Sequence, residues 1–187
     1  MPQNSIIDIE EYQIKADDIF FFDNNIWMYL FCPLGKFQSK KQAIYSKFFS
    51  YALSRESHIY INSLVLSEFS NRYLRLDFDL YNEEQKKKKF PETFKNFKND
   101  YVGSNRYQET VKEIKVHLKK IIGICQKSSD EFNAINIDDV FNLFISIGFN
   151  DSYYIHLSKL KNWLIVSDDS DFTKDKIPKV GLTVLTA

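Results

Sequence analysis

The chain has 187 residues, of which 44% are hydrophobic, 27% charged and a high 16% aromatic. That size and balance suit one globular domain with a ring-rich core, and only five Gly and four Pro argue against a turn-rich β-sandwich. The formal net charge of zero neither requires nor excludes a nucleic-acid partner, whereas a small basic binding protein would show itself by its charge.

Cysteine content and the pattern of apolar runs bear on the compartment. Two cysteines, Cys32 and Cys125, are too few for a disulfide framework. The N-terminus lacks a basic segment followed by an apolar core, so no signal peptide is evident. No apolar run approaches the ~20 residues needed to span a bilayer. We therefore expect a cytoplasmic protein in a reducing environment, without membrane contact.

Charge is distributed unevenly along this neutral chain. Residues 86–120 hold eleven Lys and Arg against four Asp and Glu, whereas residues 128–175 are dominated by acid. The basic stretch opens with four consecutive lysines, Lys86, Lys87, Lys88 and Lys89. Such a run is most often a solvated surface, and its functional interpretation is phosphate contact in nucleic-acid binding.

In chain order, the first 17 residues are mixed in character and predict a lead-in or a short helix. Residues 19–22 are apolar and mostly aromatic, which predicts a strand buried on both faces. Next come predicted helices over 26–31 and 39–55, a short strand over 58–61, and a helix from Ser63, as its N-cap, to about Asp79.

The second half of the chain continues this alternation. An amphipathic helix is predicted over 104–126. The later predicted elements are a short strand at 132–135, a helix at 137–147 ended by Gly148, a helix at 151–161, and strands at 163–166 and 182–185. Strands that alternate with helices predict an α/β sandwich with a mostly parallel sheet.

Two of the predicted buried strands end in acidic residues, Asp23 after the first and Asp169 after the later one. The carboxyl ends of parallel strands meet at one edge of a sheet, where ligands collect, so we expect these acids to lie together. Clustered carboxylates repel one another and lose hydration when buried, which a cation normally offsets. Hard oxygen ligands select Mg²⁺ or Mn²⁺, whose natural reaction here is phosphodiester hydrolysis.

Four short segments, taken in order, resemble the motifs of PIN-domain nucleases. The first covers residues 21–27, where Asp23 and Asn25 match the motif and Asn24 replaces the usual Thr or Ser. The second covers residues 61–69, with Glu68 in the second turn of a helix. These two segments place one acid after a strand and another on the next long helix.

The remaining two motifs lie near the C-terminus. Asp151 begins a predicted helix, as in the third motif of the family. Residues 165–172 resemble the terminal motif, with Ser167 at its hydroxyl position, Asp169 as the principal acid and Asp171 as a secondary one. Asp169 is preferred over its neighbour Asp168 by this alignment alone.

The resemblance implies a three-layer PIN-like α/β/α sandwich over residues 1–187, with a helical elaboration at about 82–128. It implies an Mg²⁺- or Mn²⁺-dependent endoribonuclease, similar to the VapC-like toxins of type II toxin–antitoxin systems, with RNA as substrate, an antitoxin as partner and a homodimeric state. The implied catalytic residues and metal ligands are Asp23, Glu68, Asp151 and Asp169, with Asp171 as a further ligand and Asn25 and Ser167 in support.

Other interpretations remain open at this point. Asp23 could be a turn residue, Glu68 a solvated helix residue and Asp151 a plain N-cap. A haloacid-dehalogenase-like phosphatase also has an apolar strand that ends in Asp, but it requires a second Asp where this chain has Asn25. A non-catalytic PIN-like binding module is the third alternative.

Overall fold

The computed structural model describes residues 4–172, 177 and 181–187, so positions 1–3 of the predicted lead-in and 173–175 of the acidic stretch lie outside the described residues. Its centre is a six-stranded sheet in the order β1-β6-β5-β2-β3-β4, and every described pair of strands is parallel. The strands are β1 (Ser5–Asp8), β2 (Ile19–Phe22), β3 (His58–Ile61), β4 (Gln126–Lys127), β5 (Leu164–Val166) and β6 (Thr183–Thr186).

Helices lie between β2 and β3, between β3 and β4, and between β4 and β5, as the sequence predicts. They are α1 (Asn24–Phe31), α2 (Ser39–Ser54), α3 (Ser63–Lys86), α4 (Asn105–Ile124), α5 (Ile137–Phe144) and α6 (Phe149–Lys161), with a π-helix η1 (Phe97–Tyr101) and a 3₁₀ helix η2 (Ser170–Phe172). Within the described residues, no helix combines the length and apolar character that crossing a membrane requires.

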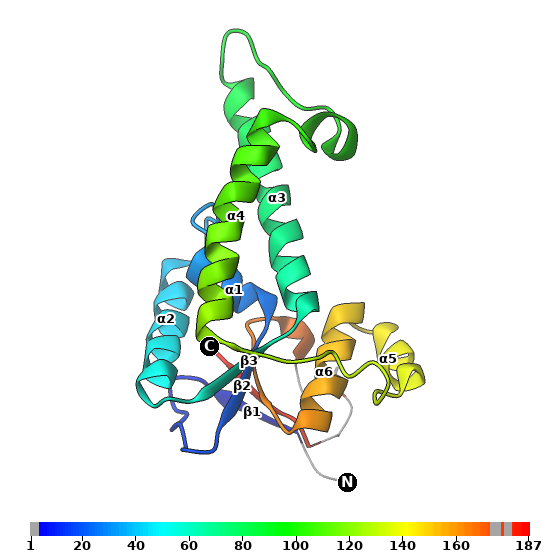
Figure 1. The fold of residues 1–187 in the computed structure, drawn as a ribbon. Coiled ribbons are helices and arrows are strands. Elements are labelled where there is room, and N and C mark those ends of the chain that lie inside the picture. The colour runs from blue at the N-terminus through cyan, green and yellow to red at the C-terminus, as the bar shows by residue number, and fades with distance from the viewer. Residues whose placement is uncertain (1–3, 173–176, 178–180) are drawn as a thin grey trace.

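The side chains of β2 show how the layers are built. Phe20 and Phe22 point to the face covered by α2, where both rings pack on Phe48 with centroids 5.4 and 6.3 Å away. Phe21 points to the opposite face and meets Tyr154 of α6 at 5.0 Å. Because helices cover both faces, each residue of this strand is apolar. The predicted α/β/α sandwich with a parallel sheet is confirmed (Figure 1).

The stretch predicted as a helical elaboration is a hairpin that projects from the body of the molecule (Figure 1). α3 continues past its predicted end near Asp79 to Lys86, and α4 runs back beside it. Asp77 of α3 is 1% exposed and is bonded by three residues of the returning segment. Tyr101 Oη and Thr110 Oγ1 donate to it at 2.8 and 2.9 Å, and the Arg106 guanidinium pairs with both carboxylate oxygens.

Three local predictions are wrong. Residues 5–8 form the edge strand β1 beside β6, where a lead-in or short helix was expected, because the distant β6 supplies the backbone partners. Residues 132–135 contain a turn and no strand, since Glu131 with φ 55° reverses the chain; the short strand β4 lies earlier. Asn62 rather than Ser63 caps α3, with its Oδ1 accepting from the amide nitrogen of Val65 at 3.1 Å.

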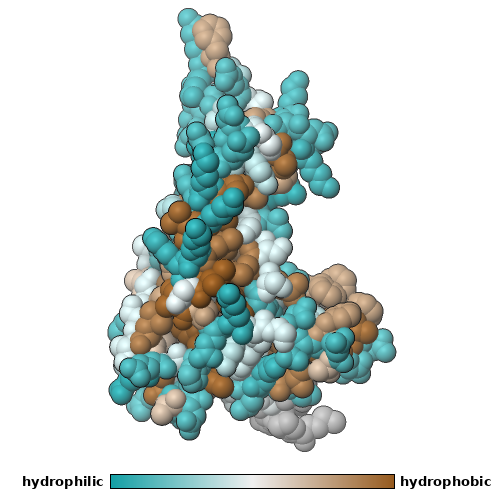
Figure 2. Space-filling view, in the orientation of Figure 1, coloured by the Kyte–Doolittle hydropathy of each residue, from teal (hydrophilic) through white to brown (hydrophobic). Residues whose placement is uncertain are grey.

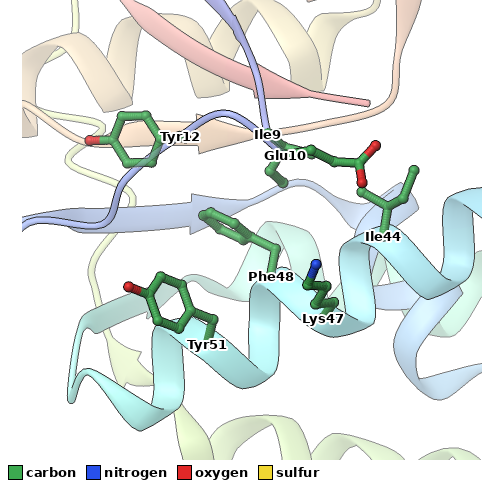
Figure 3. Close-up of a pocket in the computed structure, with 7 residues that line it drawn as sticks. All are labelled: Ile9, Glu10, Tyr12, Ile44, Lys47, Phe48 and Tyr51. Atoms are coloured by element: carbon green, nitrogen blue, oxygen red, sulfur yellow. The ribbon is translucent and has the colours of Figure 1, made fainter.

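A pocket of about 250 Å³ lies between the segment after β1 and helix α2 (Figure 3). It is mostly apolar, and Glu10 and Lys47 are the charged side chains in its lining of Ile9, Glu10, Tyr12, Ile44, Lys47, Phe48 and Tyr51. None of the acids predicted as catalytic lines this pocket, so it is not the predicted site.

Candidate active site

A second pocket, of about 320 Å³, is lined by all four acids that the sequence predicts as catalytic, Asp23, Glu68, Asp151 and Asp169. They come from four places in the fold. Asp23 follows β2, Glu68 lies in the second turn of α3, Asp151 lies in the first turn of α6, and Asp169 follows β5. Because β2 and β5 are parallel neighbours, their carboxyl ends deliver Asp23 and Asp169 to the same edge of the sheet.

Asp23 is 4% exposed, and its carboxylate accepts several hydrogen bonds. Oδ2 accepts from Ser167 Oγ and from Asn25 Nδ2, both at 2.7 Å, and Oδ1 accepts from the Asn24 amide at 2.5 Å. Asn25 Nδ2 also donates to Ser167 Oγ at 3.1 Å. The two residues predicted to support the site therefore contact Asp23 directly and join the ends of β2 and β5.

The loop after β5 holds Asp169 beside this network. Ser167 Oγ accepts from the Asp169 amide at 3.1 Å, and the Asp169 carboxylate accepts from the Asp171 amide at 2.9 Å. Asp169 is exposed and lines the pocket, whereas Asp171 lies on η2 and is not part of the lining. Asp171 therefore contacts Asp169 without itself lining the pocket.

Asp168 differs from its neighbour Asp169 in its contacts. In the sequence, only the motif alignment separates these two acids. The Asp168 carboxylate pairs with Lys41 Nζ at 2.6 Å and accepts from Tyr29 Oη at 2.6 Å and Tyr45 Oη at 3.2 Å. Its charge is thus compensated, and it fastens the loop after β5 to α1 and α2. Asp169 makes no such ion pair within the described residues.

Glu68 is held by two residues that sequence reasoning missed as parts of the site. Its Oε2 accepts from Asn150 Nδ2 at 3.0 Å and from Tyr154 Oη at 3.1 Å. Asn150 and Tyr154 are four residues apart on α6 and so share one face of that helix. The spacing is visible in the sequence, but nothing local indicates that this face meets α3.

Arg72 is a third residue that sequence reasoning missed. It lies one turn after Glu68 on α3 and belongs to the lining of the acidic pocket. Its side chain is exposed and forms no ion pair or hydrogen bond with the described residues. Of the predicted phosphate-binding lysines 86–89, Lys86 ends the same helix and the other three follow it, and none of the four lines the pocket.

Gly148 makes room for Asp151. The sequence predicts Gly148 as the end of the preceding helix, but α5 ends at Phe144 and Gly148 is the N-cap of α6. A Cβ atom on Gly148 would lie 2.7 Å from Asp151 Oδ2. Glycine therefore lets this carboxylate sit at the N-terminus of α6, where the helix dipole favours negative charge.

Burial and mutual repulsion make two of the pocket acids, Asp23 and Asp151, hard to ionise. The pKa of Asp23 is raised to about 8, mainly by desolvation and also by the charges of Asp151 and Glu68, while the hydrogen bond from Ser167 acts in the opposite direction. Desolvation also raises the pKa of Asp151 to about 7, with contributions from Asp169, Glu68 and Asp171. No Lys or Arg among the described residues forms an ion pair with Asp23 or Asp151.

The donor chemistry of the pocket suits Mg²⁺ or Mn²⁺, because its acids offer hard oxygen atoms with uncompensated charge. Within the described part of the chain, no three or more His, Cys, Asp or Glu side chains are placed so that they could together hold a metal ion. Mg²⁺ commonly binds through one or two carboxylates and keeps several waters. An open pocket with spaced acids therefore fits a hydrated ion better than a closed cage of ligands.

Comparison with known proteins gives a likeness of fold. No family model matches the chain, and no curated protein matches its sequence. Among solved structures, it is similar to VapBC2 from Rickettsia felis bound to a DNA fragment from their promoter, with a TM-score of 0.53 and 14% sequence identity over 90% of this chain and 98% of that chain. The VapC- or PIN-like fold expected from the four motifs thus has structural support, and identity this low shows the fold alone.

Proposed function

We propose that the chain is a metal-dependent endoribonuclease that hydrolyses RNA phosphodiester bonds with Mg²⁺ or Mn²⁺. The observation that carries this proposal is one pocket at the carboxyl edge of a parallel sheet, lined by Asp23, Glu68, Asp151 and Asp169 from four elements. Their lack of ion-pair partners among the described residues leaves the pocket in need of a cation.

In this proposal a hydrated cation would be held among Asp23, Glu68, Asp151 and Asp169, with Asp171, next to Asp169, as a further ligand. When bound, it supplies positive charge to the phosphate and lowers the pKa of a water molecule. Ser167 and Asn25 fix the Asp23 carboxylate through Oδ2. Asn150 and Tyr154 fix Glu68 through Oε2, which leaves Oε1 as the atom that can take a proton from water. No covalent intermediate with the chain is expected.

The direct test is cleavage of single-stranded RNA by the wild type and by Asp23→Asn and Asp151→Asn. Each variant should lose activity by at least about 100-fold, since each removes a charged oxygen ligand. The matched control is Asp17→Asn, an exposed acid outside the pocket, which should cleave like the wild type. EDTA should abolish cleavage and Mn²⁺ restore it. Equal activity of the wild type and Asp23→Asn would overturn the proposal.

We further infer that the chain is the toxin of a type II toxin–antitoxin system. The order of the four motifs and the fold shared with VapBC2 from Rickettsia felis support this inference. An antitoxin protein would then be its partner, and the same resemblance leads us to expect a homodimer. Size-exclusion chromatography with light scattering on the purified chain tests the dimer, and a monomer at micromolar concentration would contradict it.

A further inference from the structure

The projecting hairpin concentrates positive charge. Residues 86–120 carry eleven Lys and Arg against four Asp and Glu, a net of seven positive charges, and the rest of this neutral chain therefore carries seven negative ones. Ten of the eleven basic side chains are exposed, and the exception is Arg106, which pairs with Asp77. We call residues 86–120 the basic arm.

None of these ten exposed charges forms an ion pair with an acid among the residues that the structure describes. Three ion pairs join side chains of the described residues, and only Arg106–Asp77 lies in the hairpin. The end of the arm that holds lysines 86–89 projects from the body of the molecule (Figure 1), whereas Lys120 at its other end lies beside α1. Hydrophilic residues dominate the outer end of the arm on the face that Figure 2 shows. A surface of uncompensated like charge repels itself and attracts polyanions.

An aromatic side chain at the tip of the arm points to a particular kind of polyanion. Phe90 is 80% exposed and directly follows the four lysines 86–89, and Lys89 Nζ lies 5.7 Å from the centre of its ring. Exposed aromatic rings among basic groups are typical of surfaces that bind single-stranded nucleic acids, because bases stack on the ring while the cations contact phosphates. Binding of an acidic protein would require the positive charges of the lysines but not the exposed ring of Phe90.

Arg72 connects the arm with the acidic pocket. It lies in the pocket lining one turn after Glu68, and α3 then leads from Arg72 to Lys86 at the base of the tip. Its guanidinium is exposed and makes no ion pair with the described residues, so it does not neutralise the pocket acids in this way. A free guanidinium there has the geometry to grip a phosphate through two parallel hydrogen bonds.

We propose that Arg72 and the basic arm bind the phosphate backbone of single-stranded RNA and lead one strand from the arm to the pocket. The identity of the strand as substrate rests on the proposed ribonuclease function. Arg72 and Lys86 are separated by about 21 Å along α3, at ~1.5 Å per residue. That distance corresponds to about six nucleotides at a stacked spacing of ~3.4 Å. A trinucleotide therefore reaches Arg72 but not the tip.

Binding is measured first, in EDTA, so that the outcome does not depend on catalysis. The probe is a fluorescent 20-nucleotide single-stranded RNA titrated with the full chain at several salt concentrations. Replacing the four lysines 86–89 by Gln should weaken binding at least about 10-fold and reduce the slope of log Kd against log salt by about 3. The control replaces four exposed lysines elsewhere, Lys15, Lys47, Lys127 and Lys159, and should change Kd less than about 2-fold.

Phe90→Ser distinguishes RNA from an acidic protein partner. It should weaken RNA binding by about 5-fold or more while it leaves the salt slope unchanged, because a ring and not a charge is removed. An unchanged Kd and salt slope for the variant lacking lysines 86–89 would overturn the proposal. So would binding of a poly-glutamate peptide as tight as that of RNA, with no effect of Phe90→Ser on either.

Cleavage kinetics then separate Arg72 from the arm. On a trinucleotide, Arg72→Gln should lower kcat/KM at least about 10-fold, with partial rescue by Arg72→Lys, whereas loss of lysines 86–89 should have no effect. On the 20-nucleotide RNA, loss of those lysines should raise KM and leave kcat unchanged. A wild type that binds RNA but does not cleave it would contradict the proposed function and leave the binding proposal standing.

Discussion

Asp23 shows how the surroundings of one residue determine its chemistry. The aromatic residues that make β2 a fully buried strand also carry the next carboxylate into the protein interior, where it caps α1 through the Asn24 amide. Burial raises its pKa, and the hydrogen bond from Ser167 offsets only part of that cost. If this position only stabilised the fold, a neutral Asn or Ser would be more favourable there than a buried carboxylate.

The first prediction concerns the pH dependence of stability without metal. Between the ordinary pKa of 3.8 and about 8, folded Asp23 keeps a proton that the unfolded chain has released, so stability falls as pH rises through that window. Asp23→Asn removes this contribution. The free energy of unfolding is measured in urea with EDTA at pH 5 and at pH 8. It should decrease between these pH values in both proteins, and the decrease in the variant should be smaller than in the wild type by roughly 2 to 4 kcal/mol.

A control for this measurement is Asp17→Asn, which removes an exposed acid and should follow the wild type at both pH values. Parallel losses of stability in the wild type and Asp23→Asn would show that Asp23 is already ionised at pH 5. Asp151, whose pKa is about 7, keeps part of the pH dependence in the variant.

At the scale of elements, α3 has two roles at its two ends. Its N-terminal turns place Glu68 and Arg72 at the pocket, and its C-terminal turns form one side of the hairpin. α3 and α4 pack along each other, and contacts within the hairpin help to fix how α4 returns. Asp77 provides the central one, because a single buried carboxylate binds Tyr101, Arg106 and Thr110 from the returning segment.

The second prediction tests this contact with Asp77→Ala. The variant leaves Arg106, whose side chain is 39% exposed, without its partner, so the local cost should be about 2 kcal/mol rather than the ~3–5 kcal/mol of a fully buried pair. Hydrogen exchange over residues 97–110 should accelerate by at least about 10-fold, and exchange in β2 and β5 should not change. Asp79→Ala, an exposed acid on the same helix, is the control, and equal exchange in both variants would contradict a special role for Asp77.

For the whole molecule, the separation of charge is the dominant feature. The basic arm projects from a body that carries the compensating negative charge, and the acidic pocket lies at the N-terminal end of α3. A polyanion is therefore attracted to one part of the molecule and repelled by the other unless a cation occupies the pocket. Metal and RNA should consequently favour each other's binding.

The third prediction concerns the proposed toxin role. Induced expression of the wild type in a bacterial host should slow or arrest growth, because an active endoribonuclease cleaves RNA that the cell needs. Asp23→Asn at a matched protein level should permit normal growth, and co-expression of a small neighbouring antitoxin gene should restore growth to the wild-type strain. Unimpaired growth with abundant folded wild type would contradict the toxin role while leaving RNA cleavage in vitro to be judged separately.

The sequence by itself determined the fold class and the position of two acids. The apolar residues of β2 and β5 predict buried strands, because each side chain of such a strand packs in a nonpolar layer. This apolar character can be recognised from a short stretch of sequence. Parallel strands share an edge at their carboxyl ends, so the proximity of Asp23 and Asp169 followed without coordinates. Glu68 and Asp151 were predicted from motifs, and their roles as ligands remain predictions.

Only the tertiary structure decided which side chains meet across elements. β1 and β4 are short edge strands whose pairing partners lie far away in the chain, so local composition did not reveal them. The contacts of Glu68 with Asn150 and Tyr154 likewise join two helices about 80 residues apart, and the Lys41 ion pair of Asp168 joins α2 to the loop after β5. Periodicity shows which face of a helix is buried, but the packing of the whole chain decides what that face contacts.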